Sequence, residues 1–534
     1  MSPTERGSAA IARAFRAEGV RVIFGVLGNA NMEFAAHFAD LEGCRYLGVR
    51  HEHTAVAAAE GYARIGGDVG VATVTLGPGL THATTSLITA ARGRVPVVIF
   101  AGWSPVGPQT MDQEKFAEVS ECRSVMFRSL ADVAEAFFIA RTSRVPVVLN
   151  VPVALQEAET RPEPYEPRPV PLRADTEPDA TAVRDAARAL SQAARPVILA
   201  GRGSLGAVEE IEELAELIGA PIGHTLPAKG DLGGRRYDVG TAGGYATDAA
   251  VDAFRGADWV IAVGTSLSRN TTRGGAFFPS ASVLQVDLEA GRVPVTVALV
   301  SDARLGVRAL IAELRRIGSV PRPLRVPTED AFAREMALHA PAIEPGTLDP
   351  RLVARALDRS LPSDALIVTD SGHFHFFLCT FIGPGPGRRF EVQNDFGAIG
   401  QGLGRAIGAA VAAPGRRVLF AAGDGGFMQA LHDLDSIGRY CPNVTSLVMN
   451  DGAFGAEFHR LGAQRLGAEK ATYPSLDLAR IAELMGLRGR RGDSVDAIES
   501  AVADSLTDDR PWLIDVPISR AVVSRPYRET VMTR

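Results

Sequence analysis

The sequence predicts an α/β protein made of three doubly wound parallel-sheet domains. A chain of 534 residues is too long for one domain. Short apolar runs alternate with helix-like patterns along it, an order typical of parallel sheets with helices on both faces. Two segments rich in proline and charge, residues 158–180 and 321–350, are typical of exposed linkers. We therefore expect domains at residues 1–160, 185–320 and 350–534.

The first block opens with an amphipathic helix pattern over residues 1–18, with Ile11 and Phe15 on its apolar side. Four apolar runs in this block predict strands, at residues 20–24, 69–75, 95–101 and 145–151. The second block begins with the strand-like run at residues 195–200 and continues to about residue 318. The third block contains the acidic motif described next.

Two aspartates follow strand-like runs in the third block. Asp424 lies in Gly423-Asp424-Gly425-Gly426, and Asp451 lies in Asn450-Asp451-Gly452. The 24 residues from 426 to 449 leave room for one crossover helix, so both carboxylates are expected at the same edge of a parallel sheet. Mg²⁺ binds one or two carboxylates together with phosphate oxygens, and the glycines let the backbone approach a diphosphate closely.

Glu52 opens an alanine-rich, helix-like stretch that runs to residue 64. A carboxyl group in such apolar surroundings is poorly solvated, so its protonated form becomes accessible near neutral pH. The alternative is a solvated glutamate that the helix dipole stabilises.

The spacing of Asp424 and Asp451 resembles the metal motif of thiamine diphosphate enzymes. The stretch around Glu52 resembles a second motif of the same enzymes, in the expected order along the chain. Five more segments resemble the acetolactate synthase and benzoylformate decarboxylase branch, at residues 24–28, 71–79, 95–98, 225–230 and 397–400. The resemblance covers nearly the whole chain, and the family is that of thiamine diphosphate-dependent 2-oxo acid decarboxylases and carboligases.

The resemblance implies a pyrimidine-binding first domain, a central Rossmann-like domain and a diphosphate-binding third domain. It implies that Asp424, Asp451 and the carbonyl of Ala453 hold Mg²⁺, and that Glu52 exchanges a proton with the aminopyrimidine ring. Gly397 would accept a hydrogen bond from the cofactor's amino group, and Ile399 would keep its two rings bent. The other implied cofactor contacts are Gly28, Gly79, His373, Gly423, Gly425, Gly426, Ala453 and Phe454.

Four residues are candidates on the substrate side: Glu52's neighbour His53, and Asn29, Gln109 and Glu457. We hypothesise that Glu457 handles protons on the reacting intermediate while Asn29 orients it; the alternative for Glu457 is a solvated position at a helix start. Gln109 matches a glutamine of the carboligase branch, and the paired histidines of pyruvate decarboxylases are absent around it. His51 is expected to position the Glu52 loop, and His82 stands where many relatives carry Asn.

The central block contains Gly201-Arg202-Gly203-Ser204-Leu205-Gly206, which fits a dinucleotide-binding pattern. The acid expected to bind the ribose is missing, and His224 stands near its place, so nicotinamide binding is not expected. Residues 266–270 depart from the flavin signature of acetohydroxyacid synthases, so FAD is not expected either. A flavin-containing acetolactate synthase and a non-catalytic nucleotide-binding relic of the fold remain alternatives, although a relic has no reason to keep Glu52, Asp424 and Asp451.

The composition of the chain restricts the classes of partner and the cellular location that we expect. The net charge of −6 is spread along the chain, and no run is apolar enough to span a membrane, so neither a nucleic acid nor a membrane is expected. The four cysteines form no close pair and, with no signal peptide pattern, indicate a cytoplasmic protein. We expect a 2-oxo acid substrate, with an aldehyde or ketone as a candidate acceptor, and a homodimer or homotetramer.

Overall fold

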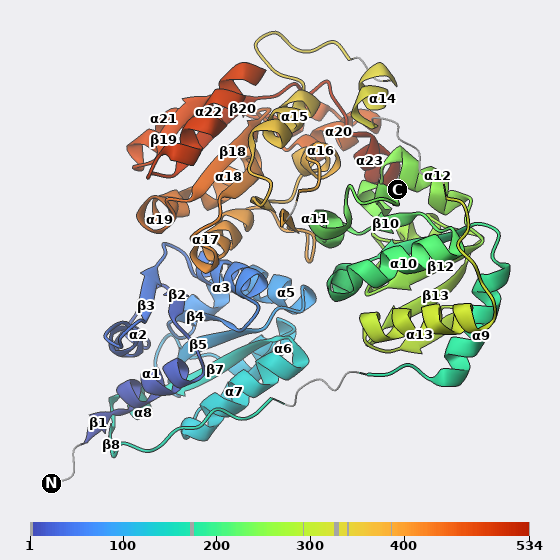
Figure 1. The fold of residues 1–534 in the computed structure, drawn as a ribbon. Coiled ribbons are helices and arrows are strands. Elements are labelled where there is room, and N and C mark those ends of the chain that lie inside the picture. Colours follow the sequence, from blue (N-terminus) through green and yellow to red (C-terminus); the bar gives the residue numbers. More distant parts are fainter. Residues whose placement is uncertain are drawn as a thin grey trace.

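Three parallel sheets of six strands each organise the chain (Figure 1). The computed structural model describes residues 4–170, 176–291, 293–324, 331–338, 341–385 and 387–532. Helices flank each sheet, so the α/β class with three doubly wound domains is confirmed. Within the described ranges, no helix has both the length and the apolar character needed to cross a bilayer.

The first sheet has the strand order β3-β2-β4-β5-β7-β6. Its strands are β2 (Val22–Gly25), β3 (Arg45–Gly48), β4 (Gly70–Val74), β5 (Val97–Trp103), β6 (Arg123–Met126) and β7 (Pro146–Pro152). Its helices are α1 (Gly7–Ala17), α2 (Met32–Ala39), α3 (Glu52–Gly66), α4 (Pro78–His82), α5 (Thr84–Arg92), α6 (Gln113–Val119), α7 (Leu130–Ser143) and α8 (Val153–Glu157). The short strands β1 (Glu5–Arg6) and β8 (Glu159–Thr160) pair antiparallel. Ile11 and Phe15 of α1 are fully buried, as the amphipathic pattern predicts.

The third sheet has the order β16-β15-β17-β18-β20-β19. Its strands are β15 (Leu366–Thr369), β16 (Arg389–Val392), β17 (Val418–Gly423), β18 (Val444–Asn450), β19 (Arg488–Arg491) and β20 (Trp512–Pro517). Its helices are α15 (Pro350–Ser360), α16 (Phe374–Phe381), α17 (Gly402–Ala412), α18 (Asp424–Ala430), α19 (Leu434–Tyr440), α20 (Gly455–Ala463), α21 (Leu478–Leu484), α22 (Val495–Thr507) and α23 (Arg525–Tyr527). Numbered from the first strand of each domain, the first and third sheets share the order 2-1-3-4-6-5. The two domains therefore share a topology, although no repeat is visible in their sequences.

The central sheet has the order β11-β10-β9-β12-β13-β14, which is 3-2-1-4-5-6 in chain order and thus the Rossmann arrangement. Its strands are β9 (Pro196–Ala200), β10 (Ile222–His224), β11 (Asp238–Thr241), β12 (Trp259–Val263), β13 (Ser282–Asp287) and β14 (Val297–Val300). Its helices are α9 (Ala180–Gln192), α10 (Val208–Ile218), α11 (Lys229–Leu232), α12 (Asp248–Arg255) and α13 (Ala303–Arg316).

The two predicted linkers differ. Between β8 and α9 the described residues form no helix or strand, and residues 171–175 of this predicted linker lie outside the description. The segment 321–350 instead contains helix α14 (Ala331–Leu338), because Phe332 packs its ring against Phe381 at 5.4 Å. The remaining residues 325–330 and 339–340 of that predicted linker are also outside the description. The exact domain boundaries stay predictions.

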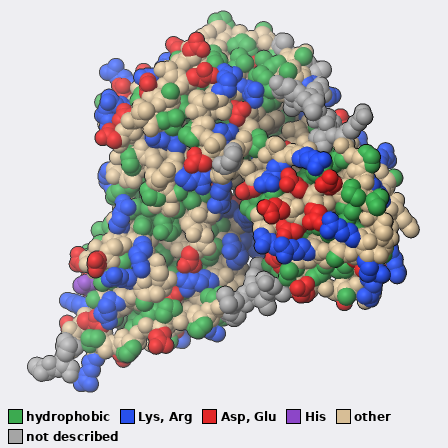
Figure 2. Space-filling model, viewed as in Figure 1, with side chains coloured by type: hydrophobic (Ala, Val, Ile, Leu, Met, Phe, Trp, Pro, Cys, Tyr) green, Lys and Arg blue, Asp and Glu red, His purple; other side chains and the backbone are tan. Residues whose placement is uncertain are grey.

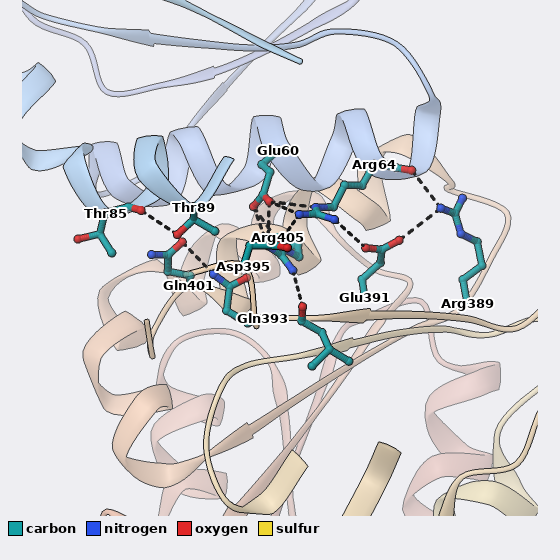
Figure 3. Close-up of polar contacts among 11 residues, drawn as sticks. Glu60, Arg64, Thr85, Thr89, Arg389, Glu391, Gln393, Asp395, Gln401 and Arg405 are labelled. Atoms are coloured by element: carbon teal, nitrogen blue, oxygen red, sulfur yellow. Dashed lines mark hydrogen bonds and ion pairs between the residues drawn. The ribbon is translucent and has the colours of Figure 1, made fainter. Parts of the chain in front are cut away.

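Helices α3 and α17 join the first and third domains into one continuous core. Small residues let their backbones touch: a Cβ added at Gly408 would lie 1.9 Å from the carbonyl oxygen of Ala58. A buried polar network surrounds this contact (Figure 3), in which Arg405 of α17 donates to Glu60 of α3 at 2.8 and 3.0 Å. Arg64 donates to the same carboxylate at 2.9 Å. The first domain is therefore joined to the third by a shared apolar core and by buried ion pairs.

The face of the molecule seen in Figure 2 carries acidic and basic side chains interspersed, without a broad area of one sign. This distribution agrees with the small net charge and gives that face no electrostatic footprint for a nucleic acid.

Candidate active site

A cavity of about 390 Å³ opens at the carboxyl ends of β15, β17 and β18. This is the point where the strand order of the third sheet reverses, the usual ligand position in open α/β sheets. Its lining comes from the loops after β15 and β18, the loop that carries Gly397 and Ile399, helix α18, the starts of α16 and α20, and Ile518. A wider depression of about 780 Å³ lies around Arg488, Arg490 and Asp508, but its arginines and carboxylates already pair with one another.

Asp424 and Asp451 meet on the wall of this cavity, as their spacing predicts. Strands β17 and β18 pair in parallel register, with Gly423 opposite Met449. Asp424 accepts the N–H of Gly452 at 2.9 Å. Burial raises the pKa of both aspartates, and the charge of Asp424 raises that of Asp451 further. A buried carboxylate and a partly buried one that repel each other fit a divalent cation, which would neutralise both.

The cofactor-side glycines have two different physical roles. A Cβ at Gly426 would lie 2.4 Å from Asp370 Oδ2, and one at Gly425 would lie 2.7 Å from the ring of Phe454. These two glycines are thus required by packing within the protein, a reason that sequence reasoning missed. Gly397 instead has φ 77° and open space where a Cβ would stand, so its backbone is free to face a ligand. Gly423 has the side chain of Phe374 3.1 Å from the position of a Cβ.

His373 lines the cavity and is held in one tautomer. Its Nε2 accepts the backbone N–H of Ser524 at 3.0 Å, and burial keeps its pKa well below the usual value. The proton of the neutral ring therefore lies on Nδ1, which leaves Nδ1–H as a donor. The rings of His459 and Tyr527 pack against it at 4.5 and 4.9 Å. This arrangement fits a hydrogen bond to a diphosphate oxygen.

Asp370 was not singled out from the sequence, yet it shapes the cavity. It follows β15, is buried, and accepts the N–H of Gly400 at 2.7 Å and that of Gly402 at 3.3 Å. Burial raises its pKa to about 6. These bonds fix the loop that carries Gly397 and Ile399, both of which line the cavity. The available signal was its position directly after a strand, which it shares with Asp424.

Glu457 lies in the first turn of α20, the helix expected after the metal motif, and lines the cavity. Phe454 precedes this helix with 39% of its surface exposed, and Ala453 lines the cavity beside it. The hydroxyl of Tyr527 donates to the carbonyl of Ala456 at 2.8 Å and ties the C-terminal segment to the start of α20.

Glu52 begins α3, as predicted, and is 9% exposed. The side chain of His51 caps this helix by accepting the N–H of His53 at 3.1 Å, which fixes the loop before Glu52. The carboxylate Oε2 of Glu52 lies 3.1 Å from His82 Nδ1. His53 lies with its Nε2 3.3 Å from the carbonyl of Gly400, and burial lowers its pKa to about 4.

The other first-domain candidates lie at the carboxyl edge of the first sheet. Asn29 and Gln109 are exposed, while Gly28 packs against Thr75, 2.7 Å from the position of a Cβ. Gly79 lies beside Glu52, with 3.5 Å between its Cβ position and Oε1. The described residues that line the cavity all belong to the third domain. Within one chain, the candidates therefore form two groups on two domains rather than one closed site.

The glycines of the central dinucleotide-like motif are explained by packing. A Cβ at Gly201 would lie 2.3 Å from the carbonyl oxygen of Gly264, and one at Gly203 would lie 2.9 Å from its Cα. His224 lies 3.3 Å from the carboxylate of Asp238, where a ribose-binding acid was sought. The expectation that this domain holds neither a nicotinamide cofactor nor FAD stays a prediction.

Three family models match successive parts of the chain. They describe a thiamine pyrophosphate enzyme: the N-terminal TPP binding domain at residues 5–122, the central domain at 183–310 and the C-terminal TPP binding domain at 370–516. The matches follow the three sheets in order.

Relatives that match over nearly their full length point to the same family as the three models. An acetolactate synthase of Mycobacterium bovis is 30% identical over 545 residues, which cover 95% of this chain and 87% of the relative. A probable acetolactate synthase large subunit of Methanocaldococcus jannaschii is 29% identical, with 97% and 92% covered. A putative thiamine pyrophosphate-containing protein of Bacillus subtilis is 27% identical, with 94% and 89% covered. The chain belongs to the thiamine pyrophosphate enzyme family. It is a thiamine diphosphate-dependent enzyme of the decarboxylase and carboligase kind, as the sequence resemblance implied.

Proposed function

We propose that the enzyme removes carbon dioxide from a 2-oxo acid. The remaining carbon unit then either takes up a proton or is joined to an aldehyde or ketone acceptor. The observation that supports this most is the pair Asp424 and Asp451 on the wall of a cavity that also contains Glu457. Transfer to a second 2-oxo acid, as an acetolactate synthase carries out, is the second candidate, and the full-length relatives of that name favour it.

Asp424, Asp451 and the carbonyl of Ala453 would hold Mg²⁺, and His373 Nδ1–H would bind the diphosphate. Bound thiamine diphosphate supplies the carbon nucleophile and the electron sink. The bulk of Ile399 faces the cavity and supports its role as the wedge between the cofactor's rings. Phe454 and the glycines 28, 79, 397, 423, 425 and 426 complete the proposed cofactor contacts.

Glu52 would hold the proton that the aminopyrimidine ring takes up and returns. Its burial at the start of α3 supports this role because the aminopyrimidine ring would meet the carboxyl group away from bulk water. Glu457 would return a proton where carbon dioxide leaves, with Asn29, Gln109 and His53 on the substrate side. A Glu457→Gln variant should form product at least tenfold more slowly. Unchanged turnover of every accepted substrate would leave Glu457 with no role in proton transfer.

A second copy of the chain would complete each site. The cavity lining comes from the third domain alone, whereas Glu52 lies on the first. Exposed apolar side chains near both edges support a covered surface; they are Leu27, Met32, Phe396 and Met428. We therefore propose a homodimer or a tetramer of such dimers. We also propose a cytoplasmic location, which the four free and buried cysteines support.

The test is a screen of 2-oxo acids with and without aldehyde or ketone acceptors, read by mass spectrometry. Each reaction is run with thiamine diphosphate and Mg²⁺, and again with EDTA added. Carbon dioxide release with formation of an aldehyde or a hydroxyketone supports the proposal. A cofactor-loaded protein that consumes no member of the series contradicts it, and a 2-hydroxy-2-methyl-3-oxo acid product would favour the second candidate.

A further inference from the structure

The side chain of Glu52, which the proposed reaction uses, is paired with that of His82, which the proposed reaction leaves without a role. His82 ends α4, and its Nδ1 lies 3.1 Å from Glu52 Oε2. The Glu52 side chain is 11% exposed, while that of His82 is 56% exposed. The pair therefore connects a buried carboxyl group to the surface of its own domain.

The two oxygens of the Glu52 carboxylate have different surroundings. We assign the shared hydrogen to His82 Nδ1, which then donates to Oε2. Beside Oε1 lies Gly79, which has no side chain there. One oxygen is thus engaged by the imidazole, and the other is left open on the glycine side.

The His82 ring is itself held in place. The ring of His51 stacks on it, with centroids 5.0 Å apart and planes at 26°. His51 is fixed in turn, because its Nδ1 caps α3 and because His432 of the third domain packs against it at 5.3 Å. The donor that reaches Glu52 therefore stands on a supported ring rather than on a free surface side chain.

A metal ion is a weaker interpretation of the same cluster. Ligand atoms of His51, Glu52 and His82 lie within 4.8 Å of one another. His51 Nδ1 accepts the N–H of His53, however, so the proton of its neutral ring lies on Nε2 and leaves no lone pair there. If His51 bound a cation through Nδ1, the helix cap would break. If His51 kept the cap, only Glu52 and His82 would remain as ligands.

We propose that His82 is a positioning residue for Glu52: its Nδ1–H holds Oε2, so that Oε1 faces the place of the aminopyrimidine ring. This inference rests on the proposed role of Glu52 and adds the group that fixes the direction of its proton transfer. A freely rotating carboxyl group would spend most of its time with neither oxygen aligned.

The first experiment uses the cofactor-free protein. Histidine labelled with ¹⁵N reports which ring nitrogen of His82 carries the proton, with the His82 signals assigned by their loss in His82→Asn. We expect the Nδ1–H tautomer in the wild type and its loss in Glu52→Leu. An Nε2–H tautomer in the wild type, or one that Glu52→Leu leaves unchanged, overturns the proposal.

The second experiment measures hydrogen–deuterium exchange at the thiazolium carbon of the loaded enzyme. The amide of His82→Asn can place an N–H where Nδ1 stands, so exchange should stay within about threefold of the wild type. His82→Leu removes the donor, and exchange should fall at least tenfold. His37→Asn, on α2, is the control for the loss of a histidine elsewhere in the domain.

Glu52→Gln separates the proposed role of Glu52 from the proposed positioning role of His82. Wild-type exchange in Glu52→Gln would remove the proposed role of Glu52 itself. Loss of exchange in Glu52→Gln together with wild-type exchange in His82→Leu would overturn only the positioning role. Equal losses in His82→Asn and His82→Leu would also overturn it, because the restored donor would then have no effect.

Discussion

Replacing Arg405 by methionine tests how firmly the first domain is fixed against the third. Arg405 and Glu60 are each 1% exposed, and Arg405 donates to the Glu60 carboxylate at 2.8, 3.0 and 3.3 Å (Figure 3). Removing one partner of a buried ion pair costs about 3–5 kcal/mol, because the remaining charge stays buried without compensation. Arg64 still donates to Glu60 at 2.9 Å, so we expect the lower end, about 3 kcal/mol.

The double variant Glu60→Leu/Arg405→Met tests whether the stability loss comes from the uncompensated charge of Glu60. It removes one charge of each sign and leaves Arg64 facing Asp395 and Glu391, with Arg389 paired to Glu391. Since no uncompensated charge remains, the double variant should recover at least half of the stability lost in Arg405→Met.

The assay is guanidinium unfolding of the loaded enzyme, with the free energy taken from the first cooperative transition. Arg168→Met, which removes an exposed ion pair with Glu135, is the control and should change stability by less than about 1 kcal/mol. A loss below about 1 kcal/mol in Arg405→Met would refute the reasoning. So would a double variant that loses as much stability as Arg405→Met and Glu60→Leu lose together when measured singly.

Three other predictions concern the cofactor, the assembly and pH. Asp424→Ala should abolish the Mg²⁺-dependent part of thiamine diphosphate binding in calorimetric titrations, because a diphosphate charge is left uncompensated; equal affinity with and without the substitution contradicts the metal site. Activity should disappear in step with the dimer in analytical ultracentrifugation at increasing dilution, and an active monomer contradicts the shared site. Burial lowers the pKa of His375 to about 4, so the unfolded chain takes up a proton first as the pH falls below about 6.5. This residue should therefore cost about 2 kcal/mol of stability between pH 7 and pH 5. His375→Gln should lose less stability than the wild type over that interval in urea unfolding, and equal losses would contradict the assignment.

The geometry of the proposed metal site was predictable because it depends on local rules. Strand ends, one crossover of fixed length and parallel register bring Asp424 and Asp451 to the same sheet edge, and the register of β17 and β18 confirms it. The start of α3 at Glu52 followed in the same way from an alanine-rich helix pattern. The placement of Glu457 followed from its distance beyond Asp451.

The remaining features depend on contacts between residues far apart in the chain. Asp370 binds the loop at Gly400, 30 residues later, and no pattern around either residue indicates the pairing. His82 and Glu52 are likewise 30 residues apart and meet only because α3 and α4 adjoin. Helix α14 was missed because the prolines on either side of it suggested a linker, whereas its stability comes from packing against α16.

The segment after α18 connects the two groups of site residues within one chain. Asp424 starts α18, and Asp433, three residues beyond its end, accepts the backbone N–H of Arg50 at 2.7 Å, two residues before Glu52. Asp433 is fully buried and also accepts the hydroxyl of Ser436 at 2.7 Å. One short helix therefore has the proposed metal ligand Asp424 at its first residue, and Asp433, which anchors the Glu52 loop, just beyond its last.

Asp433→Ala should therefore affect Glu52 while sparing the proposed metal ligands. It leaves the N–H of Arg50 and the hydroxyl of Ser436 without their acceptor, which costs about 1–3 kcal/mol and frees the loop before Glu52. We expect thiazolium hydrogen–deuterium exchange to fall at least fivefold, while the affinity for thiamine diphosphate with Mg²⁺ stays within about threefold. Because Asp424 and Asp451 are unchanged in this variant, a loss of affinity without a loss of exchange would mean that α18 serves the metal site alone. Glu52 would then be positioned by the fold of the first domain and by the contact between α3 and α17, without a contribution from Asp433.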